Sequence, residues 1–204
     1  TGVVPAYRRR GLSRAMFEMM LAEFAKDKIE QFLLEVVTTN TAAISLYEQL
    51  GFRSVRELSL LQCDKHIENN SAPAQDIEIR DVIEPDWRLL ETFWDAKPSW
   101  QNSIDAITRC SGLKRFLGAY KNERCVGYVI FSARFGRIAQ FAVSKTHRNQ
   151  GIGSALFRAL KNEIADGFSM QVINIPKSLT ETIGFFEDLG FYERLSQHEM
   201  KKPL

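Results

Sequence analysis

The chain has 204 residues, of which 45% are hydrophobic and 25% charged, and its formal net charge is +2 at pH 7. This composition is typical of a globular protein of one or two domains and excludes a disordered or fibrous chain. The small net charge excludes an extended nucleic-acid or acidic-membrane surface. No apolar run reaches the roughly 18 to 20 residues that cross a bilayer, and no signal segment opens the chain, so we expect a soluble cytoplasmic protein. The chain begins at Thr1 without a methionine, which indicates a processed or partial polypeptide.

The opening segment predicts a loop, a helix, a strand, a second helix and a second strand. Apolar residues at helical spacing occupy positions 15–24, and positions 42–50 return to that spacing before Gly51, which ends the helix. Positions 32–37 form a short apolar, partly β-branched run of strand length. Residues 64–75 are polar and bury little, so we place a linker at residues 61–75.

The longer C-terminal part predicts a complete α/β module with a mixed sheet over residues 76–204. Its hairpin turns are expected at residues 121–124 and 134–137. Strands are expected at 76–82, 116–120, 125–132, 138–143 and 170–175, and helices at 84–93, 102–110, 154–165 and 179–189.

An internal repeat relates the two parts. A shift of 139 positions aligns residues 48–52 with residues 187–191. A shift of 140 aligns identical residues of the opening segment with later ones: Val3 with Val143, Arg8 with Arg148, Gly11 with Gly151, Ala15 with Ala155, Phe17 with Phe157, Glu23 with Glu163 and Ala25 with Ala165. Residues 1–60 therefore correspond to the C-terminal half of the module at 76–204.

The cysteines and histidines show no spacing typical of a metal site or a redox pair. Because free cysteine packs as a small hydrophobic residue, we expect buried free thiols and no metal. The residues concerned are Cys63, Cys110, Cys125, His66, His147 and His198.

A glycine-containing turn precedes the first helix of each repeat. Such a turn leaves backbone N–H groups unpaired at the positive end of the helix dipole, and glycine lets an anion approach the backbone closely. Flanking arginines add charge-assisted donors, so the turn suits a pyrophosphate. An ordinary turn with a solvated basic face is the alternative. The two copies are Arg148-Asn149-Gln150-Gly151-Ile152-Gly153, followed by Ser154, and Arg8-Arg9-Arg10-Gly11-Leu12-Ser13.

These motifs resemble those of the GCN5-related N-acetyltransferases, the GNAT superfamily. The signature Gln/Arg-x-x-Gly-x-Gly/Ala is matched by residues 148–153 and, with Ser13 in the last place, by residues 8–13. A second signature, an Asn before a helix that bears Tyr and ends Leu-Gly-Phe, is similar to residues 40–52. The resemblance implies a GNAT acyl-CoA N-acyltransferase fold, with one complete module and a C-terminal half-module.

The resemblance also implies acetyl-CoA as the cosubstrate. Its pyrophosphate would lie on the turn, at residues 148–154 or, in the first copy, at Val3, Arg8, Arg9, Arg10, Gly11 and Ser13. Its pantetheine arm would pair with the preceding strand, at Phe141, Ala142 and Val143. The acetyl group would pass directly to an amine in a ternary complex, without a metal.

The same resemblance points to Tyr47 and Asn40 as catalytic residues. A phenol with a pKa of about 10 is able to protonate a departing thiolate, and Asn40 would fix local geometry through its amide. Packing of Tyr47 on the sheet is the alternative. The second copy has Phe186 and Leu179 at these places, and Gln140 stands in the strand where many relatives have a carboxylate base.

We therefore predict an N-acetyltransferase that acts on a primary amine of a small molecule or a protein. The alternative is an inactive CoA-binding or structural module that partners an intact GNAT domain. A homodimer in which two chains complete each other's half-module is a third hypothesis. No nucleic acid or membrane partner is expected. Three tryptophans could stack on the acceptor or pack in the core: Trp87, Trp94 and Trp100.

Overall fold

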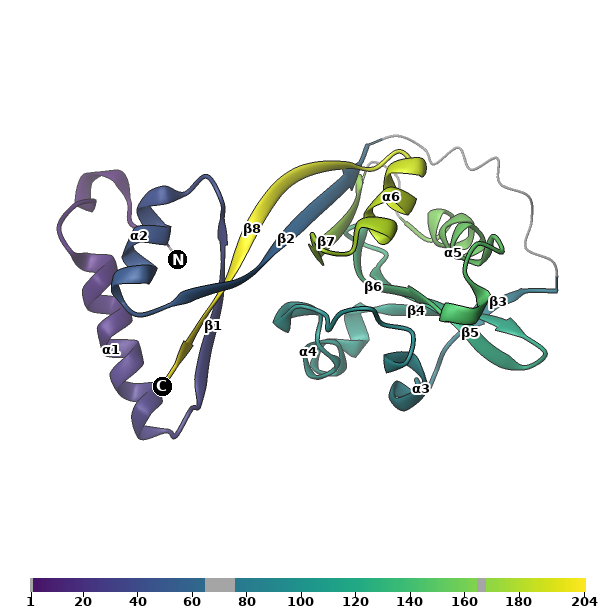
Figure 1. The fold of residues 1–204 in the computed structure, drawn as a ribbon, viewed down its shortest axis with the longest axis horizontal. Helices are drawn as coiled ribbons and strands as arrows, with labels where there is room; N and C mark the ends of the chain where they lie inside the picture. Colours follow the sequence, from purple (N-terminus) through teal and green to yellow (C-terminus); the bar gives the residue numbers. More distant parts are fainter. Residues whose placement is uncertain (1, 65–75, 165–167) are drawn as a thin grey trace. The chain divides into compact units, whose positions relative to one another are not determined.

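The computed structural model describes residues 2–64, 76–164 and 168–204. It is a mixed α/β fold whose strands follow the order β1-β8-β2-β7-β6-β5-β4-β3 (Figure 1). The strands are β1 (Gln31–Val37), β2 (Arg53–Cys63), β3 (Glu78–Asp81), β4 (Arg115–Lys121), β5 (Arg124–Ser132), β6 (Arg137–Val143), β7 (Met170–Pro176) and β8 (Tyr192–Pro203). The helices are α1 (Leu12–Lys26), α2 (Thr41–Gln49), α3 (Trp87–Glu91), α4 (Ile104–Arg109), α5 (Ile152–Lys161) and α6 (Thr180–Asp188).

The chain forms two compact units. The first comprises Thr1–Leu58 and Ser196–Leu204, and the second comprises Ser59–Leu195. Strands β2 and β8 each contribute residues to both units. None of the helices in the described part of the chain is long and apolar enough to cross a membrane.

In the first unit, α1 and α2 pack beside the strand pair β1 and β8 (Figure 1). β1 runs antiparallel to β8, with Gln31 opposite Pro203 and Val37 opposite Gln197. A small aromatic core holds these elements together, and Phe52 at its centre is fully buried. Arg56 on β2 forms a two-pronged ion pair with Glu199 on β8, at 2.6 and 3.1 Å, which neutralises the nearly buried carboxylate.

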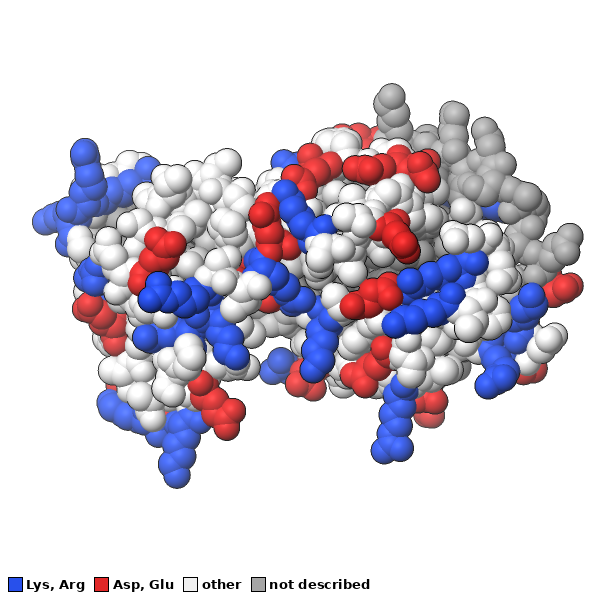
Figure 2. All heavy atoms as spheres, in the orientation of Figure 1, with Lys and Arg blue, Asp and Glu red and all other residues white. Residues whose placement is uncertain are grey.

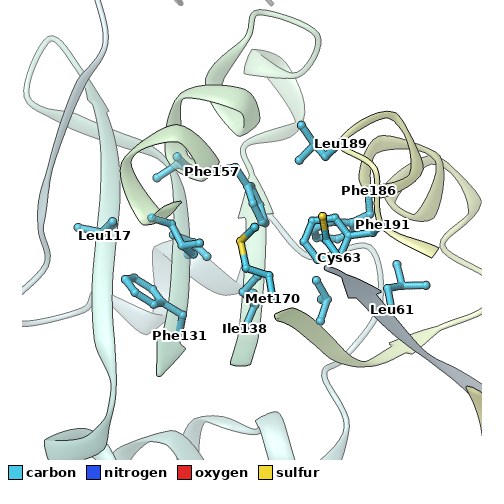
Figure 3. Close-up of a cluster of buried hydrophobic side chains, with 14 of the residues drawn as sticks. Leu61, Cys63, Leu117, Phe131, Ile138, Phe157, Met170, Phe186, Leu189 and Phe191 are labelled. Carbon is cyan, nitrogen blue, oxygen red and sulfur yellow. The ribbon is translucent and has the colours of Figure 1, made fainter. Parts of the chain in front are cut away.

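In the second unit, helices cover both faces of the sheet. Strand β5 alternates its side chains, so Val129 and Phe131 enter the core beneath α5 and α6, while Tyr128 and Ile130 face α3 and α4 (Figure 1). Figure 3 shows the first of these cores, in which aromatic rings from α5 and α6 meet at the sheet. This packing fixes the position of the loop that precedes α5.

The internal repeat recurs in the structure with closely matched bounds. A shift of 139 positions places β1 on β7 and α2 on α6 without error at either end, and places the start of β2 on the start of β8. A shift of 140 places the start of α1 on the start of α5, although α5 ends earlier. The last strands are exchanged, because β1 pairs with β8 and β7 pairs with β2. Each repeat thus contributes its final strand to the sheet beside the other repeat.

Several local expectations differ from the structure. The linker expected at residues 61–75 starts later, because β2 continues to Cys63 with Leu61 and Cys63 buried; residues 65–75 lie outside the described residues. The helix expected at 84–93 covers five residues, Trp87–Glu91, because Asp86 caps its start by accepting from the Leu89 amide. The expectation of buried thiols is wrong for Cys110, which is exposed, while Cys63 is buried and all three thiols are free.

Candidate active site

A cavity of about 660 Å³ lies in the second unit, where β6, β7, the loop before α5 and the segment after α3 meet. Its wall includes every residue from Phe141 to Val143 and from His147 to Ser154, so it holds the predicted cofactor residues of the second copy. The wall also includes residues 93–96 and residues of α6. The cavity is large enough for a substantial part of an extended ligand.

The turn before α5 has the backbone geometry that an anion site requires. Gly151 lies in the left-handed region with φ +76°, and Asn149 precedes it with φ +59°. The first hydrogen bond of the helix runs from the Ala155 amide to the Gly151 carbonyl at 3.0 Å, so the amides before Ala155 have no partner within the helix. These donors are at the positive end of the helix dipole and line the cavity.

Gly153 serves a different purpose, which is close packing. A Cβ at this position would lie 2.9 Å from the Phe185 ring and 3.1 Å from the Phe141 ring. These two rings stack with centroids 5.2 Å apart and an interplanar angle of 9°. The absence of a side chain at Gly153 lets α5 approach the sheet and α6 closely at the cavity wall.

Arg148 holds the turn in place through contacts within the protein. Its guanidinium pairs with Asp95 at 2.7 Å and donates to the carbonyl oxygens of Phe93 and Val143 at 3.1 and 3.3 Å. The segment after α3 is therefore tied to the turn before α5. In this geometry the Nε and Nη2 atoms of Arg148 already have partners within the protein.

The two strands at the cavity diverge. Parallel strands β6 and β7 pair at Arg137–Gln171 and Ile138–Val172, and their later residues are not paired with each other. The Ser144 amide bonds to the Val126 carbonyl on the β5 side. The backbone N–H and C=O groups of successive strand residues point to opposite edges of the strand. Since those of Ser144 point toward β5, those of Phe141 and Val143 point to the other, open edge of β6. That edge offers hydrogen-bonding groups to an extended ligand.

A buried network of polar groups lines the cavity where the pairing between β6 and β7 ends. Tyr128 accepts from the Trp94 indole N–H at 2.5 Å and donates to the Gln140 side-chain oxygen at 2.7 Å. Gln140 donates to the Asn102 carbonyl at 2.6 Å, and the Asn102 amide donates to the Ile173 carbonyl at 2.9 Å. Asn102 thereby bridges β6 and β7 where their own pairing ends. Burial raises the pKa of Tyr128 far above its ordinary value, so its hydroxyl keeps its proton.

Asn174 on β7 adds a second unusual polar group to this wall. It is buried, its φ is +61°, and its amide lies 3.4 Å from the Ser99 hydroxyl. Its counterpart in the first copy, Glu35, does not have a positive φ. A left-handed residue within a strand is costly, and such residues gather at binding sites.

At the positions of the predicted catalytic pair, the second copy has two apolar residues. Phe186 is 1% exposed and packs against Phe157 and Phe191, each with ring centroids 5.3 Å away. Leu179 precedes α6 with φ −85° and ψ 61°, without a side-chain cap. Neither residue offers a proton or a hydrogen bond to a ligand.

The first unit holds the predicted catalytic pair itself. Tyr47 packs on Phe17 and Phe52 at 5.2 and 5.9 Å, the same contacts that Phe186 makes in the second copy. The Asn40 side chain accepts from the Ala43 amide at 3.2 Å and so caps α2. The structure places this pair in the first unit and the residues 141–154 in the second, so it does not bring the two predicted sets together within one unit.

The turn of the first copy repeats the backbone of the second. Gly11 has φ +74°, and the Arg8 guanidinium donates to the Val3 carbonyl at 3.0 Å, as Arg148 does to Val143. Arg8, Arg9 and Arg10 are exposed. Figure 2 shows basic side chains gathered at the end of the first unit, whereas both signs of charge are interspersed over the visible face of the second. Ser13, at the start of α1, is half-buried.

Sequence reasoning does not find the buried polar network, nor the clamp that Arg148 forms with Asp95 and the carbonyl oxygens of Phe93 and Val143. Trp94, which the sequence predicts to stack on the acceptor or to pack in the core, donates a hydrogen bond to Tyr128. Trp87 packs against the core beneath α3, and Trp100 is 46% exposed. The available signal was the presence of Gln140 and Asn174 in otherwise apolar strands, where amides are disfavoured unless they have partners.

Comparisons with known proteins agree with this fold. Residues 112–193 match the family model described as an acetyltransferase (GNAT) domain, and residues 2–60 match the FR47-like protein model. The chain is 48% identical over 50 residues to the [ribosomal protein bS18]-alanine N-acetyltransferase of Escherichia coli K12. That match covers 24% of this chain and 34% of the relative, so the chain spans about a third of the curated relatives it matches.

Solved structures resemble nearly the whole chain. A GCN5-related N-acetyltransferase from Sphaerobacter thermophilus aligns with a TM-score of 0.67 at 18% identity, over 98% of this chain and 70% of the other. A tandem GNAT protein from the clavulanic acid biosynthesis pathway aligns with a TM-score of 0.73 at 14% identity, over 99% and 73%. At such identities the likeness concerns the fold alone. The family model at residues 112–193 identifies a GNAT acetyltransferase domain in this part of the chain.

Proposed function

We propose that the protein transfers an acetyl group from acetyl-CoA to a primary amine of a small molecule or a protein, and that it does so in the cavity of the second unit. The observation that carries this proposal is the meeting of the anion-binding turn with the open edge of β6 in one cavity. The amides of residues 151–153 would hold the pyrophosphate, and Phe141 and Val143 would pair with the pantetheine arm.

The chemistry that acetyl-CoA supplies is an activated thioester. Attack by a neutral amine builds negative charge on the carbonyl oxygen, and an N–H on the open edge of β6 stabilises that charge. Gln140 is not a base, and Tyr128 keeps its proton, so neither accepts a proton from the amine at neutral pH. The acceptor is therefore expected to react in its neutral form, and the rate to rise with pH until the acceptor amine itself is deprotonated.

The alternative function is CoA binding without turnover. It is favoured by Phe186 and Leu179, which stand where the first copy has Tyr47 and Asn40. We test the two functions by measuring release of free CoA thiol from acetyl-CoA with a panel of amines, together with calorimetric titration of CoA. Turnover with any amine supports transfer, and binding without turnover supports the alternative. Absence of binding overturns both.

Tyr47→Phe tests the role of the first unit. If Tyr47 is the acid that protonates the thiolate, the substitution lowers kcat by about 10²-fold or more. If the reaction belongs to the second unit and water supplies the proton, kcat is unchanged. We propose the second outcome, because the Tyr47 ring packs against Phe17 and Phe52 as a core residue.

We also propose that residues 1–60 are the C-terminal half of a second GNAT module and that the protein acts in the cytoplasm. The half-module is supported by the matched bounds of the repeat and by the FR47-like match. The cytoplasmic location is supported by three free cysteines in the part of the chain that the structure describes.

The bS18-alanine N-acetyltransferases suggest a protein N-terminus as one acceptor to include in the panel of amines.

A further inference from the structure

A second cavity, of about 560 Å³, lies in the second unit between β3, α3, α4 and the start of β4. Its residues do not occur in the wall of the candidate active site. Most of the wall is apolar, and it includes Trp87 on α3 and Phe116 on β4, whose rings meet edge to face at 6.0 Å. The remaining apolar wall residues are Val82, Ile83, Pro85 and Ile107.

Three charged side chains border this cavity, and two of them neutralise each other. Arg115 pairs with Asp81 at 2.9 Å and also with Glu163, outside the wall, at 3.0 Å. Lys114 is half-buried, and the described residues give it no ion pair and no side-chain hydrogen bond. Lys114 is therefore the one charged side chain of this wall without an ion-pair partner among the described residues, and it lies next to an apolar surface.

The surroundings make this charge costly in the absence of a ligand. Burial lowers the pKa of Lys114, and the nearby positive charge of Arg137 lowers it further, while Cys110 has the opposite effect. In the described part of the chain, no carboxylate affects the pKa of this amine. An anion beside the Lys114 ammonium would offset both unfavourable effects.

We propose that this cavity binds a small carboxylic acid, with its apolar part against Trp87 and Phe116 and its carboxylate paired with Lys114. The apolar wall favours an aromatic or aliphatic body over an inorganic anion. The one ammonium without an ion-pair partner, Lys114, favours a monoanion. Ile83, which is 91% exposed at the rim, would gain cover when the cavity is filled. This site is separate from the proposed transfer reaction and does not depend on it.

The test is a titration of the protein with phenylacetate, without any coenzyme. Binding is followed by calorimetry and by the NMR signal of the Trp87 indole N–H, with Trp87→Phe used to assign that signal. We expect saturable binding of one phenylacetate per chain. The uncharged analogue phenylacetamide is expected to bind about tenfold more weakly or worse, because it does not pair with the ammonium.

Lys114→Gln is expected to weaken phenylacetate binding about tenfold or more, as the loss of a charge-assisted hydrogen bond predicts. Lys121→Gln, at the other end of β4, is the matched control and is expected to bind as the parent does. The proposal is overturned if phenylacetate gives no saturable shift at Trp87, if phenylacetamide binds equally well, or if both substitutions have the same effect. Thermal unfolding of each variant shows that the fold is retained.

Discussion

At the residue scale, two glycines with nearly the same conformation have different surroundings. Gly11 and Gly151 have φ +74° and +76°, and each precedes a helix at the same place in its repeat. The turn at Gly151 lines the cavity of the second unit, whereas the arginines beside Gly11 are exposed. The backbone geometry is therefore a property of the repeated motif, whereas the ligand site depends on the strands that face it.

Gly151→Val is expected to weaken CoA binding about tenfold or more, because a β-branched residue disfavours this φ and its side chain blocks the approach of a phosphate to the amides. Gly11→Val carries the same backbone strain and is expected to leave the affinity unchanged. Calorimetric titration of CoA measures both. Equal losses in the two variants would contradict a site in the second unit, and unfolding curves without CoA control for stability.

Tyr128 makes the stability depend on pH at the alkaline end. In the unfolded chain tyrosine loses its proton near pH 10, while the buried Tyr128 retains it because its pKa is raised. The native state then binds more protons than the unfolded state, so stability falls as pH rises above about 10, by up to about 1.4 kcal/mol per pH unit. Chemical unfolding from about pH 8 to about pH 11, a range that includes the ordinary tyrosine pKa of about 10, measures this slope.

Tyr128→Phe removes this contribution and flattens the alkaline slope. At neutral pH the variant is expected to lose about 1 to 3 kcal/mol, because Trp94 and Gln140 each lose a hydrogen-bond partner in a buried site. Tyr7→Phe is a control, since that tyrosine is exposed. A parent and a Tyr128→Phe variant with the same alkaline slope would contradict the role of burial.

At the element scale, the clamp between the end of α3 and the start of α5 decides how Arg148 is used. If Arg148 were a phosphate ligand, releasing it from Asp95 would raise or preserve CoA affinity. If it is a clamp, release loosens the turn. The three contacts of its guanidinium within the protein favour the clamp.

Asp95→Asn is therefore expected to weaken CoA binding several-fold and to lower the unfolding free energy by about 0.5 to 1 kcal/mol, the range for a partly exposed ion pair. Titration of CoA and thermal unfolding measure the two effects. Asp188→Asn, at the exposed end of α6, is the control for the loss of one carboxylate. Tighter CoA binding by Asp95→Asn would show that Arg148 contacts the phosphates.

Most elements of both repeats were predictable, because each carries a strong local pattern. The 3.6-residue period of α1 and the apolar run of β7 need no tertiary information. The short helices α3 and α4 were predicted too long, since their ends depend on the caps Asp86 and Ser103. The polar wall of the cavity was not predictable, because its partners come from the segment between α3 and α4 and from β5, β6 and β7, far apart in the sequence.

At the scale of the whole molecule, the repeat shows what the first unit lacks. The inner face of α5 packs on β3, β4 and β5, and Ile152 at its start is 2% exposed. Its counterpart Leu12 on α1 is 48% exposed. Met16 and Met20 are half-buried, whereas their counterparts Leu156 and Leu160 are fully buried. In the described part of the first unit, no strands cover this face of α1 as β3–β5 cover α5.

An uncovered apolar helix face of this kind favours association. We expect the protein to self-associate in a concentration-dependent manner, measured by sedimentation. Leu12→Gln combined with Met16→Gln is expected to shift the equilibrium toward the monomer, because it removes apolar area from the contact. Met19→Gln, on an exposed position of the same helix, tests whether the effect belongs to this face. A parent protein that stays monomeric at all concentrations would contradict the prediction.

The order of helices and strands, the internal repeat and the glycine turns were determined by the sequence alone, because they depend on the spacing of residues along the chain. The tertiary structure decided the rest. It exchanged the last strands of the two repeats, directed the Arg148 guanidinium to Asp95, and separated Tyr47 from the turn at Gly151 into different units. These features depend on contacts between distant segments, which sequence spacing does not specify.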